Sequence, residues 1–189
     1  MTCELLLLRH GETEWSRNGR HTGRTDLPLL ESGRAQALAL APLLAPLKFA
    51  RVLASPLRRA RETAELAGLH AIACDSDLME WDYGSNEGLT TAQIRARHPD
   101  WDLWREGCPG GETSAEVGAR CDRVLSKVAD DEGLVVLVAH GHVLRVLVAR
   151  WLSLAPAFGK HWVLSPASLT HLGHEHENRV ITGLNRGTP

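Results

Sequence analysis

The sequence predicts a three-layer α/β fold with a largely parallel central sheet. Short apolar runs of strand length alternate along the chain with segments of helical period, and this alternation favours a parallel sheet between two layers of helices. The 189 residues are 43% hydrophobic and 23% charged, which is an ordinary size and composition for one domain. We therefore expect residues 1–189 to form a single domain that carries a small helical insert.

Apolar runs along the chain supply the predicted strands. They occupy residues 3–8, 51–54, 134–139, 168–172 and 180–182, with a weaker run near residues 71–74. The polar segment 173–178 separates the last two runs, which indicates a terminal antiparallel pair. We expect His171, His174 and His176 to lie on the polar turn of this solvated hairpin rather than in a metal site, because the chain offers no further ligand group at metal spacing.

Helical segments fill the gaps between the apolar runs. The first is expected over residues 31–47, interrupted by Pro42, and Leu30 precedes it without a capping side chain. A second is expected to open at Ser55-Pro56, with serine as the N-cap and proline in the first helical position, where its missing N–H is not needed. A further helix over residues 142–152 follows the apolar run at 134–139.

Residues 88–111 differ in character and are expected to form a small helical cap inserted into the α/β frame. Thr90-x-x-Gln93 is a capping-box pattern for a short helix. Asp100 is the predicted cap of a second short helix that carries Trp101 and Trp104. The tryptophans of this region are expected to pack the cap against the frame.

Two predicted strands each end in a histidine that is followed by glycine. Arg9-His10-Gly11-Glu12 comes directly after residues 3–8, and His140-Gly141-His142 comes directly after residues 134–139. Ligands of open α/β sheets bind at the carboxyl ends of the strands, so His10 and His140 would share one site if their strands are neighbours. Arginine beside a histidine suits a phosphate ester, because a guanidinium supplies a fixed fork of donors and stays charged.

Four blocks of sequence resemble the histidine phosphatase superfamily, which has the phosphoglycerate mutase-like fold. They are Arg9-His10-Gly11-Glu12-Thr13 with Arg20-His21-Thr22-Gly23, Ser55-Pro56-Leu57-Arg58-Arg59-Ala60, Leu78-Met79-Glu80-Trp81-Asp82-Tyr83-Gly84, and Ala139-His140-Gly141-His142. Any one block is a weak signal, whereas four in this order are specific. Within the superfamily the chain most resembles the branch of sedoheptulose-bisphosphatase-type sugar phosphatases and related acid phosphatases.

The resemblance implies five catalytic residues. His10 would be the nucleophile, because a neutral imidazole nitrogen can attack phosphorus and leave again. Arg9 and Arg59 would clamp the phosphoryl oxygens, and His140 would donate to the phosphate from the opposite side. Glu80 would protonate the leaving oxygen and then activate water, and burial near Trp81 would help it to hold a proton.

Alternative roles were weighed for two residues of this set. Arg59 could instead form a surface ion pair with Glu62 or Glu65 on its own helix. Glu87 is the rival of Glu80 as the acid, and we favour Glu80 because the family pattern places the proton donor at the first acidic position. Glu87 is then expected to accept hydrogen bonds from loop N–H groups.

Further residues are expected to contact the substrate, namely Ser16, Thr22, Gly23, Ser55, Tyr83, Gly141 and His142. The N–H groups of Gly141 and His142, where a helix begins, would add an anion site. Ser16 stands where the family usually has asparagine, which leaves its phosphate contact open. The alternatives also stay open for Ser55 as a helix cap, Tyr83 as a packed aromatic ring and His142 as a local hydrogen-bonding residue.

These features predict a metal-independent phosphomonoester hydrolase that acts through a phosphohistidine on a small phosphorylated sugar or metabolite, with no cofactor. One alternative is a cofactor-dependent phosphoglycerate mutase, which must exclude water with a lid that this chain has only in modest form. The other is a non-catalytic phosphate-binding module, which would be favoured by the loss of His10, Arg9, Arg59, Glu80 or His140.

Net charge and hydropathy limit the possible binding partners, and the cysteine content indicates the cellular compartment. A formal net charge of −2 argues against nucleic acid, no apolar run is long enough to span a membrane, and the first run is too short for a signal sequence. The four cysteines include no Cys-x-x-Cys pair and are expected to be reduced thiols of a cytoplasmic protein. The sequence leaves the choice between a monomer and a homodimer open.

Overall fold

The computed structural model describes residues 2–187, and within them six strands form one mixed sheet. The strands are β1 (Cys3–Arg9), β2 (Phe49–Ala54), β3 (Ala73–Cys74), β4 (Gly133–Ala139), β5 (Leu169–Glu175) and β6 (Asn178–Arg186). Their order across the sheet is β3-β2-β4-β1-β5-β6. The pairings from β3 to β1 are parallel, and β1–β5 and β5–β6 are antiparallel. The predicted largely parallel α/β sheet is therefore confirmed.

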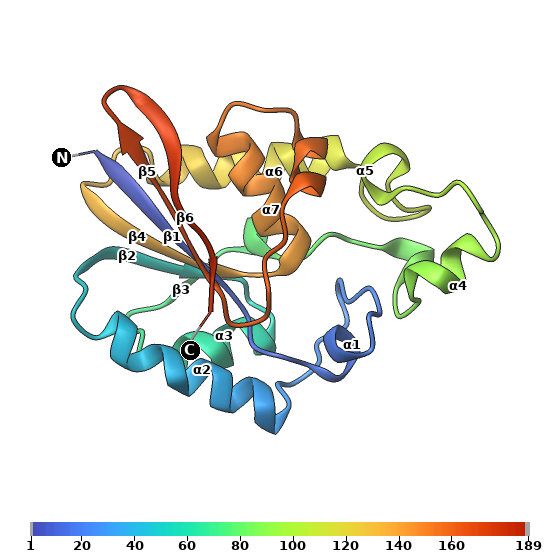
Figure 1. The fold of residues 1–189 in the computed structure, drawn as a ribbon, viewed down its shortest axis with the longest axis horizontal. Coiled ribbons are helices and arrows are strands. Elements are labelled where there is room, and N and C mark those ends of the chain that lie inside the picture. The colour runs from blue at the N-terminus through green and yellow to red at the C-terminus, as the bar shows by residue number, and fades with distance from the viewer. Residues whose placement is uncertain (1, 188–189) are drawn as a thin grey trace.

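Helices cover both faces of this sheet (Figure 1). The helices are α1 (Glu14–Arg17), α2 (Glu31–Leu44), α3 (Arg58–Leu66), α4 (Thr91–Arg95), α5 (Leu103–Glu106), α6 (Ser114–Val128) and α7 (Gly141–Trp151), with 3-10 turns η1 (Ser76–Leu78), η2 (Gly84–Asn86) and η3 (Pro156–His161). Figure 1 shows α2 and α3 on one side of the sheet and α6 and α7 on the other, which gives three layers.

The alternation of side chains along β1 explains the two cores. Leu5 and Leu7 pack into a cluster with residues of α6 and α7, whereas Leu6 and Leu8 pack into a second cluster with residues of α2 and α3. Successive side chains of a strand point to opposite faces, so a strand between two helical layers must be apolar at every position. The unbroken leucine run of β1 thus follows from its central place in the sheet.

Two predicted helix caps are wrong. Helix α3 begins at Arg58 with Leu57 in the N-cap position, and Ser55 does not cap it because the Ser55 hydroxyl lies 2.8 Å from the His140 ring. Helix α5 is capped by Asp102 rather than Asp100, because the Asp102 carboxylate accepts from the backbone N–H of Trp104. The capping box at Thr90 and Gln93 is confirmed at the start of α4.

The bounds of other elements also differ from the sequence prediction. The first helix ends at Leu44, with Pro42 inside it, and the strand near residue 73 has only two residues. Strands β5 and β6 extend toward each other until only two residues separate them. His171 and His174 therefore lie in β5 rather than on the turn, where His176 remains.

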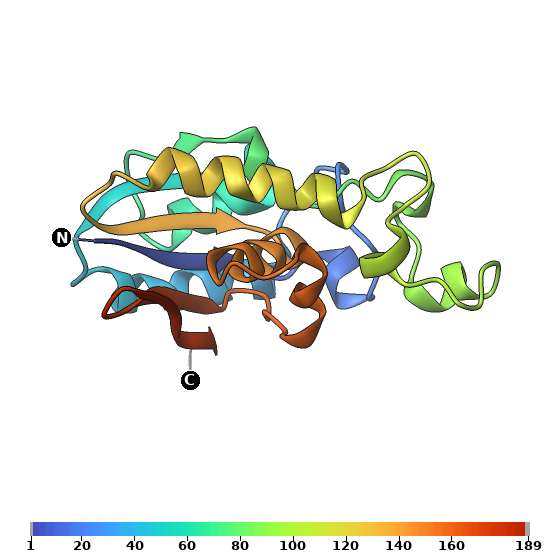
Figure 2. The same ribbon diagram turned by 90° about the horizontal axis from the view of Figure 1, so that it is seen from above.

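The register of β1 and β4 brings the two histidine motifs together. Arg9 pairs with Ala139, so His10 and His140 leave neighbouring parallel strands at the same level of the sheet. The His10 N–H donates to the Ala139 carbonyl at 2.9 Å. Figures 1 and 2 show α1, α4 and α5 beyond this end of the sheet, on the side away from the N-terminus. The carboxyl edge of the parallel strands is thus enclosed by these short helices.

Candidate active site

The imidazoles of His10 and His140 face each other at this edge. Their ring centroids are 5.0 Å apart in an edge-to-face arrangement. His10 is 4% exposed and His140 is fully buried. The structure thus brings together two side chains from opposite ends of the chain, as the strand-end motifs predict.

The hydrogen bond of His10 determines which nitrogen can react. Its Nδ1 lies 2.7 Å from the Gly11 carbonyl oxygen, which can only accept, so Nδ1 carries the proton and the lone pair lies on Nε2. Burial, together with the positive charges of Arg59 and Arg9, lowers the pKa of His10 well below its ordinary value. The neutral ring therefore has its free lone pair on Nε2 at neutral pH.

His140 is held through both of its ring nitrogens. The Arg59 Nε–H donates to His140 Nδ1 at 3.0 Å, so in the neutral ring Nε2–H donates to the Ser55 hydroxyl at 2.8 Å. Burial and the Arg59 charge hold the pKa of His140 well below its ordinary value. Because both nitrogens are engaged, His140 can donate to a phosphate only if one of these bonds opens.

Arg59 lies behind the two histidines rather than on the surface. Its Nη groups donate to the backbone carbonyls of Thr22, Gly23 and Thr25 at 2.8–3.2 Å, and the side chain is fully buried. The surface ion pair weighed as an alternative is wrong, since Glu62 instead pairs with Arg34 and Arg58. Direct contact between Arg59 and a phosphate stays a prediction.

Arg9 is the arginine that lines the cavity next to His10. Its Nη1 donates to the Leu164 carbonyl, and its buried Nε has no hydrogen-bond partner within residues 2–187. A Cβ at Gly141 would lie 3.3 Å from the Arg9 guanidinium carbon, so the glycine leaves room for this side chain. A buried, unpartnered donor of a charged group favours an anionic ligand.

Glu80 reaches the same cavity and accepts three backbone hydrogen bonds. Its Oε1 accepts from Trp81 and Val143 at 2.9 and 2.8 Å, and its Oε2 accepts from His142 at 2.9 Å. The first N–H groups of α7 therefore bind Glu80, and the predicted phosphate site on the His142 N–H is wrong. The Glu80 carboxylate occupies the anion site that was predicted for phosphate, because it is a covalent part of the protein and lies at the positive end of the helix dipole.

Tyr83 and His142 form a second wall of the cavity. The Tyr83 hydroxyl and His142 Nδ1 share a hydrogen bond of 2.6 Å. Burial, then the Glu80 charge, holds the pKa of Tyr83 well above its ordinary value, and burial beside Arg145 holds the pKa of His142 well below it. Both groups are thus uncharged near neutral pH, so they line the cavity without adding a charge that would attract or repel a phosphate.

The cavity has a volume of about 290 Å³. Eight residues predicted from the sequence line it, namely Arg9, His10, Ser16, Thr22, Glu80, Tyr83, Gly141 and His142. Ser16 also closes the capping box of α1 with Thr13. Four further predicted residues, Arg59, His140, Ser55 and Gly23, lie behind this lining in the described part of the chain. Glu87, as expected, accepts from the N–H groups of Gly23 and Thr25 at 3.0 Å.

The sequence interpretation missed Arg145, which also lines the cavity. Its guanidinium lies 4.7 Å from the centre of the Trp104 ring, and its Nε donates to the Gly159 carbonyl at 2.8 Å. Within residues 2–187 it forms no ion pair. Its spacing of four residues from Gly141, one turn of the same helix, is the signal that would have found it.

Residues 2–187 contain neither a metal-binding cluster nor a membrane-spanning helix. No group of three or more His, Cys, Asp or Glu side chains in residues 2–187 is placed to hold a metal ion. Over the same range, no helix has both the length and the apolar character needed to cross a bilayer.

The fold and the site define an α/β enzyme with a neutral histidine, a carboxylate and arginines around one cavity. The family model of the histidine phosphatase superfamily (branch 1) matches residues 5–187. The chain therefore belongs to the histidine phosphatase superfamily.

Known proteins of this superfamily match the chain over most of its length. An acid phosphatase of Mycobacterium tuberculosis is 45% identical over 184 residues, which cover 95% of this chain and 91% of the relative. Sedoheptulose 1,7-bisphosphatase of Saccharomyces cerevisiae is 34% identical over 187 residues, covering 82% of this chain and 69% of the relative. The solved structure of the product of a Mycobacterium tuberculosis open reading frame superposes with a TM-score of 0.94 at 42% identity, with 100% of both chains covered. The predicted family is confirmed, and the names of these relatives support the predicted phosphatase class.

Proposed function

We propose that this chain is a metal-independent phosphatase that hydrolyses a small phosphorylated sugar or related metabolite through a phosphohistidine on His10. The observation that carries the proposal is the state of the His10 ring. Its Nδ1 proton is directed to Gly11, its pKa is lowered by burial, and His10 lines the same cavity as Arg9.

In the first step, His10 Nε2 attacks phosphorus and the bond from phosphorus to the ester oxygen breaks. The protonated Glu80 carboxyl gives its proton to that oxygen, so the alcohol leaves uncharged.

In the second step, water attacks the phosphohistidine. The Glu80 carboxylate removes a proton from the water, the new oxygen–phosphorus bond forms, and the bond from phosphorus to Nε2 breaks. Arg9 neutralises charge on the phosphoryl oxygens in both steps, and Arg59 contributes its charge from behind the histidines. Inorganic phosphate then leaves and His10 returns to its neutral form.

The remaining lining supports a small, polar leaving group. Arg20, Thr91 and Arg145 extend the cavity beyond the groups needed for phosphoryl transfer. Hydroxyl and guanidinium donors of this kind suit the hydroxyl groups and charges of a phosphorylated sugar. The sedoheptulose 1,7-bisphosphatase relative, by its name, acts on such a compound.

The test combines an ester assay with trapping of the intermediate. We expect hydrolysis of 4-nitrophenyl phosphate and of a panel of sugar phosphates in excess EDTA, and a phosphoryl adduct on His10 after rapid quenching at alkaline pH and mass spectrometry. Loss of activity with EDTA, or an adduct on another residue, would overturn the mechanism. Isomerisation of phosphoglycerate faster than hydrolysis would favour the mutase, and no turnover of any ester would favour the binding module.

We also propose a cytoplasmic location. Cys3, Cys74, Cys108 and Cys121 are all free thiols, and Cys74 is exposed. Unpaired thiols are typical of a reducing compartment. Detection of the protein in the soluble cytosolic fraction of its host cell would support this location, and its recovery outside the cell would contradict it.

A further inference from the structure

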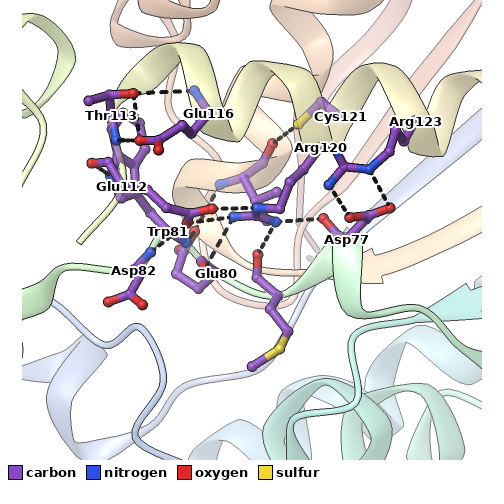
Figure 3. Close-up of polar contacts among 12 residues, drawn as sticks. Asp77, Glu80, Trp81, Asp82, Glu112, Thr113, Glu116, Arg120, Cys121 and Arg123 are labelled. Atoms are coloured by element: carbon purple, nitrogen blue, oxygen red, sulfur yellow. Dashed lines mark hydrogen bonds and ion pairs between the residues drawn. The ribbon is translucent and has the colours of Figure 1, made fainter. Parts of the chain in front are cut away.

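A largely buried ion pair, with side chains 10% and 16% exposed, holds the chain on both sides of Glu80, although it lies outside the cavity. The pair consists of Glu112, which precedes α6, and Arg120 within α6. Figure 3 shows the Arg120 guanidinium directed from the helix toward the segment that carries Glu80. Neither side chain lines the cavity in the described residues.

Arg120 binds the residues that lead into Glu80. Its Nη1 donates to the carbonyls of Asp77 and Met79 at 2.6 and 2.9 Å, and its Nη2 donates to the Glu80 carbonyl at 3.4 Å. Its Nε and Nη2 also donate to the Glu112 carboxylate at 2.7 and 2.9 Å. An arginine has five N–H donors, so all of them are used within the protein.

Glu112 binds the residues that follow Glu80. Its Oε2 accepts from the Asp82 N–H at 2.8 Å, and its backbone carbonyl accepts from the Trp81 indole N–H at 2.8 Å. The Glu112 N–H donates to the Asp82 carbonyl at 2.9 Å. Gly111 packs so closely here that a Cβ would lie 2.2 Å from the Asp82 carbonyl oxygen. The pair therefore holds the backbone before, at and after Glu80.

The carboxyl end of Glu80 is held by a different element. Its oxygens accept from the N–H groups of His142 and Val143 at the start of α7. Glu80 is thus held at both ends: its backbone is hydrogen-bonded to Arg120 of α6, and its carboxylate is hydrogen-bonded to the first N–H groups of α7. A shift of the backbone anchor would move the carboxyl group relative to His10.

The contribution of such an ion pair to the stability of the folded protein is too small to explain why it is present. Two buried charges lose their hydration, and this loss offsets most of their attraction, so an apolar pair of similar size is often as stable. Catalytic groups, in contrast, lose activity when they move by about 1 Å from the productive geometry. The observed contacts suit a role in geometry, because three of the five Arg120 donors are directed to the carbonyls of the Glu80 segment.

We propose that Arg120 and Glu112 are positioning residues that hold Glu80 where it can protonate the leaving oxygen. The inference rests on the proposed function, since it gives Glu80 the role of acid. It predicts that damage to the pair weakens proton donation specifically, while attack by His10 Nε2 continues.

Two substrates separate these effects. 4-Nitrophenolate leaves as a stable anion and needs little help from an acid, whereas the alkoxide of a sugar phosphate must receive a proton as its bond to phosphorus breaks. The ratio of kcat/KM for the sugar phosphate to kcat/KM for 4-nitrophenyl phosphate reports the proton donation step, because kcat/KM covers events up to departure of the alcohol. A general loss of structure would lower both values together.

The test variants are Arg120→Lys and Glu112→Gln, with Glu80→Gln as the reference for loss of the acid. We expect each of the two to lower the sugar phosphate to aryl phosphate ratio by about tenfold or more, and Glu80→Gln to lower it further. Arg123→Gln is the matched control, because Arg123 is exposed on the same helix and binds the Asp77 side chain but not the Glu80 backbone. It should leave the ratio within a factor of about two.

The thermal midpoint Tm of each variant shows whether it folds. An unchanged ratio, or equal losses for both substrates in a folded variant, would overturn the inference. If Arg120→Lys does not fold, Glu112→Gln decides, and if neither folds, the pair is a folding requirement and the inference is wrong. Failure of the proposed function is distinguishable, because wild-type protein would then lack esterase activity or His10→Ala would keep it.

Discussion

Two groups of histidines in this molecule share a residue type and differ in chemistry. His10 and His140 lie at the carboxyl edge of the parallel strands and are buried. Their ring nitrogens form hydrogen bonds with Gly11 in the case of His10, and with Arg59 and Ser55 in the case of His140. On the β5–β6 hairpin, His171 is 38% exposed and lies 2.9 Å from Glu4, whereas the ring of His174 packs 5.2 Å from that of Trp151. Burial and hydrogen-bond partners therefore distinguish the two groups, although the residue type is the same.

The largest expected effect separates the two groups by activity. We expect His10→Ala to lower kcat for 4-nitrophenyl phosphate by about 10⁴-fold or more, because the variant has no nucleophile. His174→Ala should keep kcat within a factor of about two, since its ring contacts Trp151 on the hairpin side of the molecule. Steady-state assays with both variants measure this, and comparable losses would remove the distinction between the groups.

The next effect concerns stability at acidic pH. Burial lowers the pKa values of His10, His140 and His142 in the folded state, so below pH 6.5 the unfolded chain binds more protons and the free energy of unfolding falls with falling pH. Each of the three residues should cost about 1.4 kcal/mol at pH 5.5 relative to pH 7.5, or about 4 kcal/mol together. Urea unfolding at both pH values measures the difference, which His140→Gln should reduce by about 1.4 kcal/mol. Equal stability at the two pH values would contradict the neutral state of the site.

A smaller effect is expected from the partner of His140. Ser55→Ala removes the oxygen that accepts from His140 Nε2, and the buried N–H loses a bond of about 1–1.5 kcal/mol. We expect kcat/KM to fall by about tenfold, which corresponds to about 1.4 kcal/mol. Ser126→Ala, on the exposed face of α6, is the matched control and should leave kcat/KM unchanged. An active Ser55→Ala enzyme would show that the His140 ring is held by Arg59 alone.

The smallest effect tests the hairpin itself. His171→Gln removes a partly exposed contact with Glu4, and exposed ion pairs contribute about 0–1 kcal/mol. We expect the free energy of unfolding at pH 7 to change by less than about 1 kcal/mol and kcat/KM to stay constant. Urea unfolding and the ester assay check both, and a large loss of activity would connect the hairpin to the site.

Local patterns predicted most of the sheet and several parts of the site. The apolar runs of β1 and β4 and the histidines that follow them are read directly from the sequence, because a strand buried on both faces must be continuously apolar. The predicted caps were wrong at Ser55, since helix α3 begins only at Arg58, and at Asp100, since Asp102 caps α5. The Ser55 hydroxyl forms a hydrogen bond with His140, which is 85 positions away in the chain and cannot be inferred from the local sequence.

The electrostatics of Glu80 show the same division. Its place in an acidic block predicted that it is the acid, and its burial was expected and is observed. The three N–H groups that donate to its carboxylate come from Trp81 and the start of α7, and the Arg120–Glu112 pair behind it joins α6 to the same segment. These contacts depend on how α6 and α7 pack on one face of the sheet, so they required the three-dimensional structure.

The order of residues was enough to predict that two strands each end in a histidine followed by glycine, that arginines accompany these histidines, and that the fold is α/β. The tertiary structure decided that β4 lies beside β1 with Arg9 opposite Ala139, which of the arginines reach the cavity, and which nitrogen of each imidazole carries its proton. The difference arises because the two kinds of interaction act over different distances along the chain. Strand propensity and turn formation act between near neighbours in the chain, whereas strand order, burial and hydrogen-bond partners arise from contacts between segments far apart in it.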